Sequence, residues 1–234
     1  KSGENYRNWW PPPAMTAFTD RSIDLLERIA SDTQNRINMT RRGYILATRS
    51  EDTQLLMDEL VQGYGDANAG NIRVHDGGAS NTYQPPFRAD WADAPNGVDV
   101  LACAALVREH FPSYASDIST LVHVRRAGAI SGQQLGQYML EALRGDGFKR
   151  VLGRVSRVDR NQTFCLTFDT VEPVLAATRI VNAAGPFAAN FADLLDYQLP
   201  VTTVFQQKIA FRDTHAAIPR DLPFSIDLDP QLID

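Results

Sequence analysis

Cysteine and histidine are scarce in this sequence. It has two cysteines, Cys103 and Cys165, and four histidines among 234 residues. Small secreted domains that depend on disulfides normally carry more cysteines, so the count argues against a disulfide framework. Both cysteines lie in apolar runs, and we expect them to be small buried side chains. The histidines show none of the HxH, HxxxH or HExxH spacings of metal ligands, which argues against a metal site.

Long hydrophobic runs and excess positive charge are also missing. No stretch is long and apolar enough to cross a membrane, and no signal-peptide core begins the chain. The formal net charge is −5, so no basic surface for nucleic acid is implied. With 44% hydrophobic and 22% charged residues, the composition is that of an ordinary globular protein. We therefore expect a cytoplasmic protein with neither a membrane span nor a nucleic-acid partner.

The familiar catalytic and nucleotide-binding motifs are absent: the sequence contains no GxGxxG, no GxSxG and no P-loop. It does contain a turn of small residues within RIVNAAGPFAAN (179–190). An apolar strand ends there in Asn-Ala-Ala-Gly (182–185), and Pro186 suits the first turn of a helix. Small side chains let a ligand approach the backbone, as dinucleotides do at the carboxyl ends of strands. Tight packing between strand and helix would also explain the same residues.

Hydrophobic periodicity and turn residues predict a mixture of helices and strands. The spacing of apolar residues predicts helices over residues 13–32, 51–64, 98–110, 131–143 and 187–195. Alternating or β-branched runs predict strands over residues 41–48, 72–75, 120–126, 151–158, 163–168, 175–182, 201–211 and 224–228. Such a mixture indicates an α/β (α+β) fold in which a nucleotide-binding layer carries an inserted, mainly antiparallel domain.

A second candidate site lies near the start of the chain. Arg7 stands between Asn5 and Asn8 and is followed by Trp9 and Trp10. An arginine fork with amide donors nearby suits a flavin or a substrate carboxylate. Two other interpretations stay open: a surface arginine stacked on a tryptophan, and a tryptophan pair that plugs the core beneath a helix.

Three stretches of the chain are informative when they are read together. They are KSGENYRNWW with the helix that follows it, RAGAISGQQLGQYMLEAL (126–143), and VLGRVSRVD followed by RIVNAAGPFAAN. In order and spacing they resemble the glycine/D-amino-acid oxidase (DAO) family of FAD enzymes, which includes sarcosine oxidase-like and dimethylglycine dehydrogenase-like members. The resemblance implies part of an FAD/NAD(P)-binding domain with an inserted, mainly antiparallel substrate-binding sheet.

The resemblance also implies how these domains divide the chain. The FAD-binding domain would take residues 1–40 and 127–198, and the substrate domain would take residues 41–126 and 199–234. The family's first Gly-rich turn would precede Lys1, and its final one would lie beyond Asp234. We therefore expect an internal fragment that, prepared alone, is inactive and binds FAD weakly or not at all.

FAD contacts are implied in two parts of the chain. Near the start of the chain, Ser2, Gly3 and Asn5 would lie beside the pyrophosphate and ribityl chain of FAD. Arg7 and Asn8 would lie close to its isoalloxazine ring. In the second half, the backbone of Val155 would contact the adenine of FAD. The turn formed by Ala183, Ala184 and Gly185 would lie along the ADP half of the cofactor. Arg7 is expected to be the catalytic residue.

The reaction implied by the resemblance is oxidation of the C–N bond of an amino acid or of a secondary or N-methyl amine. A hydride would pass to flavin N5 and water would hydrolyse the imine, while the protein orients the substrate. Substrate ligands would come from the sheet, including the strands around Tyr44 and residues 204–209. Oxygen, a quinone or another flavoprotein would accept the electrons. The alternatives are a non-catalytic assembly factor with the flavoprotein fold and a glycerol-3-phosphate dehydrogenase-like FAD enzyme.

Overall fold

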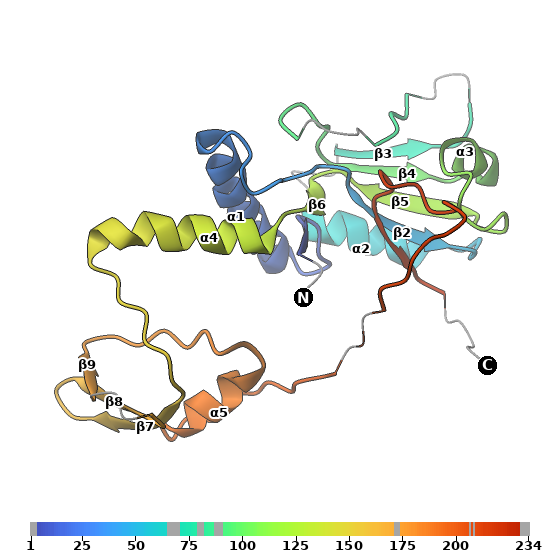
Figure 1. Cartoon of the computed structure of the whole chain (residues 1–234). Coiled ribbons are helices and arrows are strands. Elements are labelled where there is room, and N and C mark those ends of the chain that lie inside the picture. The colour runs from blue at the N-terminus through green and yellow to red at the C-terminus, as the bar shows by residue number, and fades with distance from the viewer. Residues whose placement is uncertain are drawn as a thin grey trace. The chain divides into compact units, whose positions relative to one another are not determined.

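The structure is a computed structural model that describes residues 4–64, 71–78, 82–86, 91–170, 174–205, 207 and 209–229. The chain divides into two compact units. The first consists of Lys1–Arg144 together with Asp213–Asp234, and the second of Gly145–Arg212. Figure 1 labels most of the helices and strands of both units.

A five-stranded mixed sheet forms the centre of the first unit (Figure 1). Its order is β10-β2-β5-β4-β3, with antiparallel pairs in the middle and a parallel pair at each edge. Every residue of β2, β4 and β5 is buried, including the polar side chains of Asp99 on β4 and His123 on β5. The strands are β2 (Tyr44–Thr48), β3 (Ile72–His75), β4 (Val98–Leu101), β5 (Thr120–Val124) and β10 (Phe224–Asp227).

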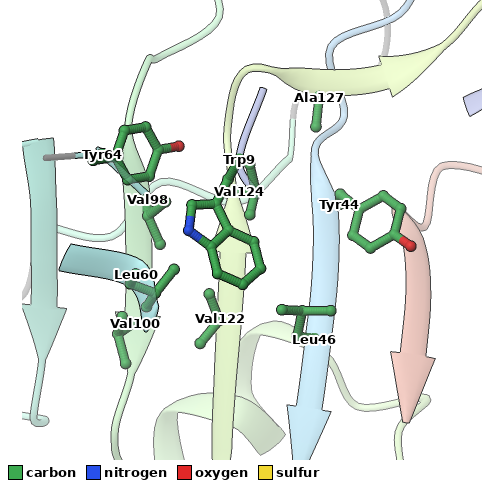
Figure 2. Close-up of a cluster of buried hydrophobic side chains, with 10 residues drawn as sticks. All are labelled: Trp9, Tyr44, Leu46, Leu60, Tyr64, Val98, Val100, Val122, Val124 and Ala127. Atoms are coloured by element: carbon green, nitrogen blue, oxygen red, sulfur yellow. The ribbon is translucent and has the colours of Figure 1, made fainter. Parts of the chain in front are cut away.

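Different elements cover the two faces of this sheet, because successive side chains of a strand point to opposite sides. On one face, Trp9 and α2 (Gln54–Tyr64) pack on side chains that include Val122, as Figure 2 shows. On the other face, α3 (Ala104–His110) packs on side chains that include Leu121. Trp9 therefore plugs the core, as one of the sequence interpretations proposed.

Arg7 belongs to a short antiparallel ribbon formed by β1 (Asn5–Arg7) and β6 (Ala127–Ala129). The helix α1 (Pro13–Asp32) packs against β1, and α4 (Gly132–Leu143) follows β6. The ribbon lies close to the chain before β2: a Cβ atom on Gly128 would lie 1.9 Å from the carbonyl oxygen of Thr40. Only glycine fits at this position, so the close approach fixes the ribbon beside residue 40.

The second unit has an antiparallel sheet of its own, in the order β7-β8-β9. After β9 the chain enters the turn of small residues and then a short helical segment. The elements are η2 (Arg144–Asp146) at the boundary of the unit, β7 (Val155–Arg160), β8 (Phe164–Phe168), β9 (Leu175–Ala177), η3 (Gly185–Phe187) and α5 (Ala188–Asp193).

The structure corrects the helix predicted over residues 98–110. Its first part, Val98–Leu101, is the strand β4, and the helix begins only at Ala104. A short apolar run is compatible with the period of a helix and with that of a strand. Here the strand period of two residues holds, because Val98 belongs to one core cluster and Leu101 to the other. The helices predicted over 13–32 and 131–143 and the strand over 72–75 are confirmed.

Four further predictions differ from the structure. The strand predicted over 201–211 does not form in the described residues of that range, since no neighbouring strand pairs with them. The strand predicted over 175–182 ends at Ala177. The helix predicted from residue 51 begins at Gln54, whose backbone N–H donates to the side chain of Asp52. The central sheet is antiparallel only in its middle pairs.

Replacing Gly128 with alanine should lower the free energy of unfolding by about 1–3 kcal/mol. The added methyl group would collide with the carbonyl of Thr40. Gly136 is the matched control, because it lies in α4 with no atom within 4 Å of an added Cβ. Gly136→Ala should raise the stability by about 0.5–1 kcal/mol. Urea denaturation measures both changes, and unchanged stability of Gly128→Ala would contradict the close approach.

Candidate functional site

The guanidinium of Arg7 lies among aromatic rings. Its central carbon is 4.1 Å from the ring centroid of Trp10, 4.6 Å from that of Tyr44 and 5.7 Å from that of Trp9. Its Nε is buried without a hydrogen-bond partner, and no carboxylate among the described residues pairs with this side chain. Burial lowers the pKa of Arg7. The stacking predicted as one interpretation is therefore present, and the charge is left without a counterion among the described residues.

Arg7 lines an apolar cavity of about 400 Å³ in the first unit. Residues of the ribbon, of α1 and of the sheet edge form its walls. The rings of Tyr44 and Phe224 lie 5.0 Å apart on the paired strands β2 and β10. The lining residues are Asn5, Tyr6, Arg7, Trp10, Thr19, Ser22, Ile23, Leu26, Tyr44 and Phe224. The cavity thus brings together Asn5, Arg7 and Tyr44, three residues that the sequence singled out.

Asn8 faces a different cavity from Arg7. Its amide donates to Asp20 (3.1 Å), its side-chain oxygen accepts from Tyr64 (3.2 Å), and its backbone N–H donates to the carbonyl of Arg126 (3.1 Å). Asn8 is buried and its hydrogen-bonding groups are used within the protein. Ser2 and Gly3, the other residues predicted here, lie outside the described residues.

The cavity beside Asn8 is polar and measures about 410 Å³. Carboxylates of α1 and two arginines form much of its wall. Arg41 donates to the Pro95 carbonyl (2.8 Å) and to the Asn96 side chain (2.7 Å). The lining residues are Asn8, Asp20, Glu27, Arg41, Tyr64, Asn71, Ala92, Asn96, Gly97 and Arg126. Of these lining residues, only Asn8 was predicted from the sequence as part of a site, because the fold brings the others together from distant segments of the chain.

The second unit contains a larger cavity, of about 900 Å³, beside the turn of small residues. Its lining residues are Gly153, Arg154, Val155, Ser156, Asp169, Val181, Asn182, Ala183, Ala184, Phe187, Asn190, Phe191 and Leu194. Val155, Ala183 and Ala184, which the resemblance assigned to FAD, therefore line one cavity. Gly185 follows Ala184 at the start of η3 and has a φ angle of +56°.

Hydrogen bonds of one side chain shape this turn, and small and apolar residues line the cavity beside it. The Asn182 side chain holds it, accepting from the backbone N–H of Ala184 (3.2 Å) and donating to the carbonyl of Ala188 (2.9 Å). The two alanines add little bulk, and Val181 and Phe187 offer apolar surface for a flat ring. The residues of the cavity thus fit the adenosine half of FAD.

A buried polar network lies on the α3 face of the sheet, and the sequence analysis missed it. The carboxylate of Asp99 accepts from Arg73 (2.6 Å), is bonded to His75 (3.0 Å) and lies 3.5 Å from Arg125. An aspartate inside the buried run VDVL was the available signal, because a buried charge needs partners. None of these four residues lines the three cavities described above, which points to a structural role.

His123 extends this network within the core. Its Nε2 donates to the carbonyl of Arg42 (2.9 Å), so its Nδ1 must accept, and the Tyr83 hydroxyl lies 3.0 Å from it. Burial lowers the pKa of His123 to about 3, so the ring is neutral at physiological pH. Such a histidine contributes to packing and hydrogen bonding rather than to proton transfer.

Three features of the described residues bear on the expectations about metals, cysteines and membranes. Within them, no group of three His, Cys, Asp or Glu side chains could hold a metal ion. Cys103 and Cys165 are free and half-buried, less enclosed than the sequence predicted. No helix in the described part of the chain is long and apolar enough to span a membrane.

Comparison with known proteins adds independent findings. The family model named DAO, described as FAD dependent oxidoreductase, matches residues 2–232. Among solved structures, the glycine oxidase from Geobacillus kaustophilus is similar in fold, with 18% identity and a TM-score of 0.55. The match covers 79% of this chain and 44% of the glycine oxidase, so the chain spans less than half of that protein. No curated protein matches the sequence.

Replacing Ala184 with leucine should weaken FAD binding by the full-length protein about 10- to 100-fold. The larger side chain would fill part of the cavity beside the turn, and overpacking of this kind costs about 1–3 kcal/mol. Ala176→Leu is the control, since Ala176 is exposed on β9 and does not line the cavity. Fluorescence titration with FAD measures both affinities. Equal affinities for the two variants would show that the cofactor does not use this cavity.

Proposed function

Because the chain belongs to the DAO family of FAD-dependent oxidoreductases, we propose that the whole protein oxidises the C–N bond of an amino acid or of a secondary or N-methyl amine. The family match agrees with the resemblance found in the sequence. The observation that carries the finer proposal is the guanidinium of Arg7, held between aromatic rings with no counterion among the described residues.

An unpaired guanidinium in an apolar cavity favours an anionic ligand. Burial removes water from the charge, and this penalty is offset when an anion pairs with it. The planar fork of arginine matches both oxygens of a carboxylate. Trp10 and Tyr44 hold the guanidinium plane by stacking, so little side-chain freedom is lost when the ligand binds. We infer that Arg7 binds the carboxylate of the substrate.

The aromatic and aliphatic walls of the cavity would orient the substrate and exclude water. Tyr44 and Phe224 form one side, and Ile23 and Leu26 of α1 form another. Positioning of this kind can supply much of the rate enhancement in a reaction that needs no dedicated acid or base. When bound, FAD supplies the hydride acceptor at its N5 atom. Water then hydrolyses the imine product.

Each unit contains some of the residues that we propose as FAD contacts. In the second unit, Val155, Ala183, Ala184 and Gly185 would meet the adenosine and ADP part, which their cavity fits. In the first unit, the proposed contacts are Asn5, Arg7 and Asn8, with Ser2 and Gly3 before them. The side chain of Asn8 is engaged elsewhere, so its contribution would be indirect.

The domain assignment is likewise a proposal. Residues 1–40 and 127–198 would belong to the FAD-binding domain, and 41–126 and 199–234 to the substrate domain. The parallel pairing of β10 with β2 supports the second part, because it joins both substrate segments in one sheet. The electron acceptor would be oxygen, a quinone or another flavoprotein.

Replacing Arg7 with glutamine should lower kcat/KM for an amino-acid substrate roughly 30-fold or more in the full-length protein. Truncating one partner of a buried charge pair costs about 2–5 kcal/mol. Arg7→Lys should lose less, since it keeps the charge but not the fork. Steady-state kinetics with an amino acid and with the matching amine that lacks the carboxylate give the comparison.

The amine without the carboxylate is the internal control. If Arg7 binds the substrate carboxylate, Arg7→Gln should affect this amine much less than the amino acid. An equal loss with both substrates would instead show that Arg7 acts on the flavin alone and does not bind the substrate carboxylate. No loss with either would exclude Arg7 from the site.

A further inference from the structure

The side chain of Arg126 is the centre of a dense ion-pair cluster on α1. It bonds Asp20 (2.7 Å), Asp24 (2.7 Å) and Glu27 (2.7 Å) through its terminal nitrogens. The three carboxylates lie at i, i+4 and i+7 and so share one face of the helix. Without Arg126 these carboxylates would repel one another more strongly, because each other nearby arginine pairs with one of them: Arg41 lies 3.5 Å from Glu27 and Arg21 lies 3.7 Å from Asp24.

The backbone of Arg126 is joined to the ribbon that carries Arg7. Its carbonyl accepts the N–H of Asn8, the residue directly after Arg7, and Ala127 pairs with Arg7 across the ribbon. The Asn8 amide also donates to Asp20, a carboxylate that Arg126 holds. One residue thus binds α1 through its side chain and the end of β1 through its main chain.

Both of these elements form walls of the apolar cavity. The ribbon contributes Arg7, and the face of α1 adjoining the carboxylates contributes Thr19, Ser22, Ile23 and Leu26. Arg126 itself does not line this cavity; it lies on the polar side of α1. Its side chain is only 16% exposed, so the cluster is held within the fold.

We propose that Arg126 is a positioning residue, which sets the distance between the Arg7 ribbon and the α1 wall of the substrate cavity. This inference rests on the proposed function, because it assumes that Arg7 and that wall hold the substrate. Loss of the three carboxylate bonds would let α1 and the ribbon move apart. A displacement of about 1 Å at such a site can reduce the rate on the order of 100-fold.

The chain offers a matched control in Arg49. This arginine also bonds three carboxylates, those of Asp117 (2.8 Å), Asp227 (2.9 Å) and Asp229 (3.1 Å). It follows β2 directly, at the opposite end of that strand from Tyr44. A comparison of the two arginines separates an effect on the site from a general loss of stability.

The experiment uses full-length, FAD-bound protein with Arg126→Gln, Arg126→Lys, Arg49→Gln and Arg49→Lys. Both glutamine variants should lower Tm by similar amounts. Only Arg126→Gln should raise KM for the amino acid, on the order of 10- to 100-fold, and change the visible circular dichroism of the bound flavin. Arg126→Lys should recover part of each effect, because it keeps the charge but bonds fewer oxygens.

A double variant tests whether Arg126 acts through Arg7. Arg7→Gln with Arg126→Gln should have a KM close to that of Arg7→Gln alone, since the same interaction is already lost. Additive effects, or equal changes of KM and flavin dichroism in Arg126→Gln and Arg49→Gln, would overturn the proposal. If no amine reduces the wild-type flavin, the proposed function is wrong. The dichroism of the Arg126 and Arg49 variants then still decides the positioning role.

Discussion

The ion pairs between Arg126 and the carboxylates of α1 are the interaction on which the first unit depends. They join a helix to a ribbon more than 90 residues away in sequence, with Glu27 and Arg126 separated by 99 positions. Like charges at i, i+4 and i+7 would otherwise destabilise α1. The same residue holds the backbone beside Arg7. The geometry of the apolar cavity therefore follows from a contact on the polar side of the helix.

The two arginines have opposite surroundings. Arg126 is bonded to three carboxylates, whereas Arg7 is stacked between rings with none among the described residues. A paired arginine contributes to structure, and a half-buried arginine such as Arg7, without a counterion among the described residues, favours a ligand that supplies one. This contrast, together with membership of the DAO family, supports the proposal that the substrate is an amine with a carboxylate group, which binds near Arg7. In the second unit, the turn of small residues lies beside a cavity with apolar surface, and this supports the proposal that FAD binds there.

Local patterns in the sequence predicted the elements whose signals are local. Pro13 and the apolar spacing after it predict α1, and the apolar spacing over 131–143 predicts α4, which Ser131 caps in the structure. Local signals failed where tertiary contacts decide. Val98–Leu101 is a strand because it is buried between two others. The sequence predicted that Arg7 stacks on a neighbouring tryptophan. The contact of Arg7 with Tyr44 and the ion pairs of Arg126 could not be predicted, because only the fold brings those chain segments together.

The most direct measurement is anaerobic reduction of the bound flavin in the full-length protein. The test compounds are N-methyl amino acids, D-amino acids and phosphorylated polyols, added without an electron acceptor. We predict that a compound with both an amine and a carboxylate bleaches the flavin absorbance. Bleaching by a phosphorylated polyol alone would indicate a glycerol-3-phosphate dehydrogenase-like enzyme, and no bleaching by any compound would indicate a non-catalytic assembly factor. Either result would contradict oxidation of a C–N bond.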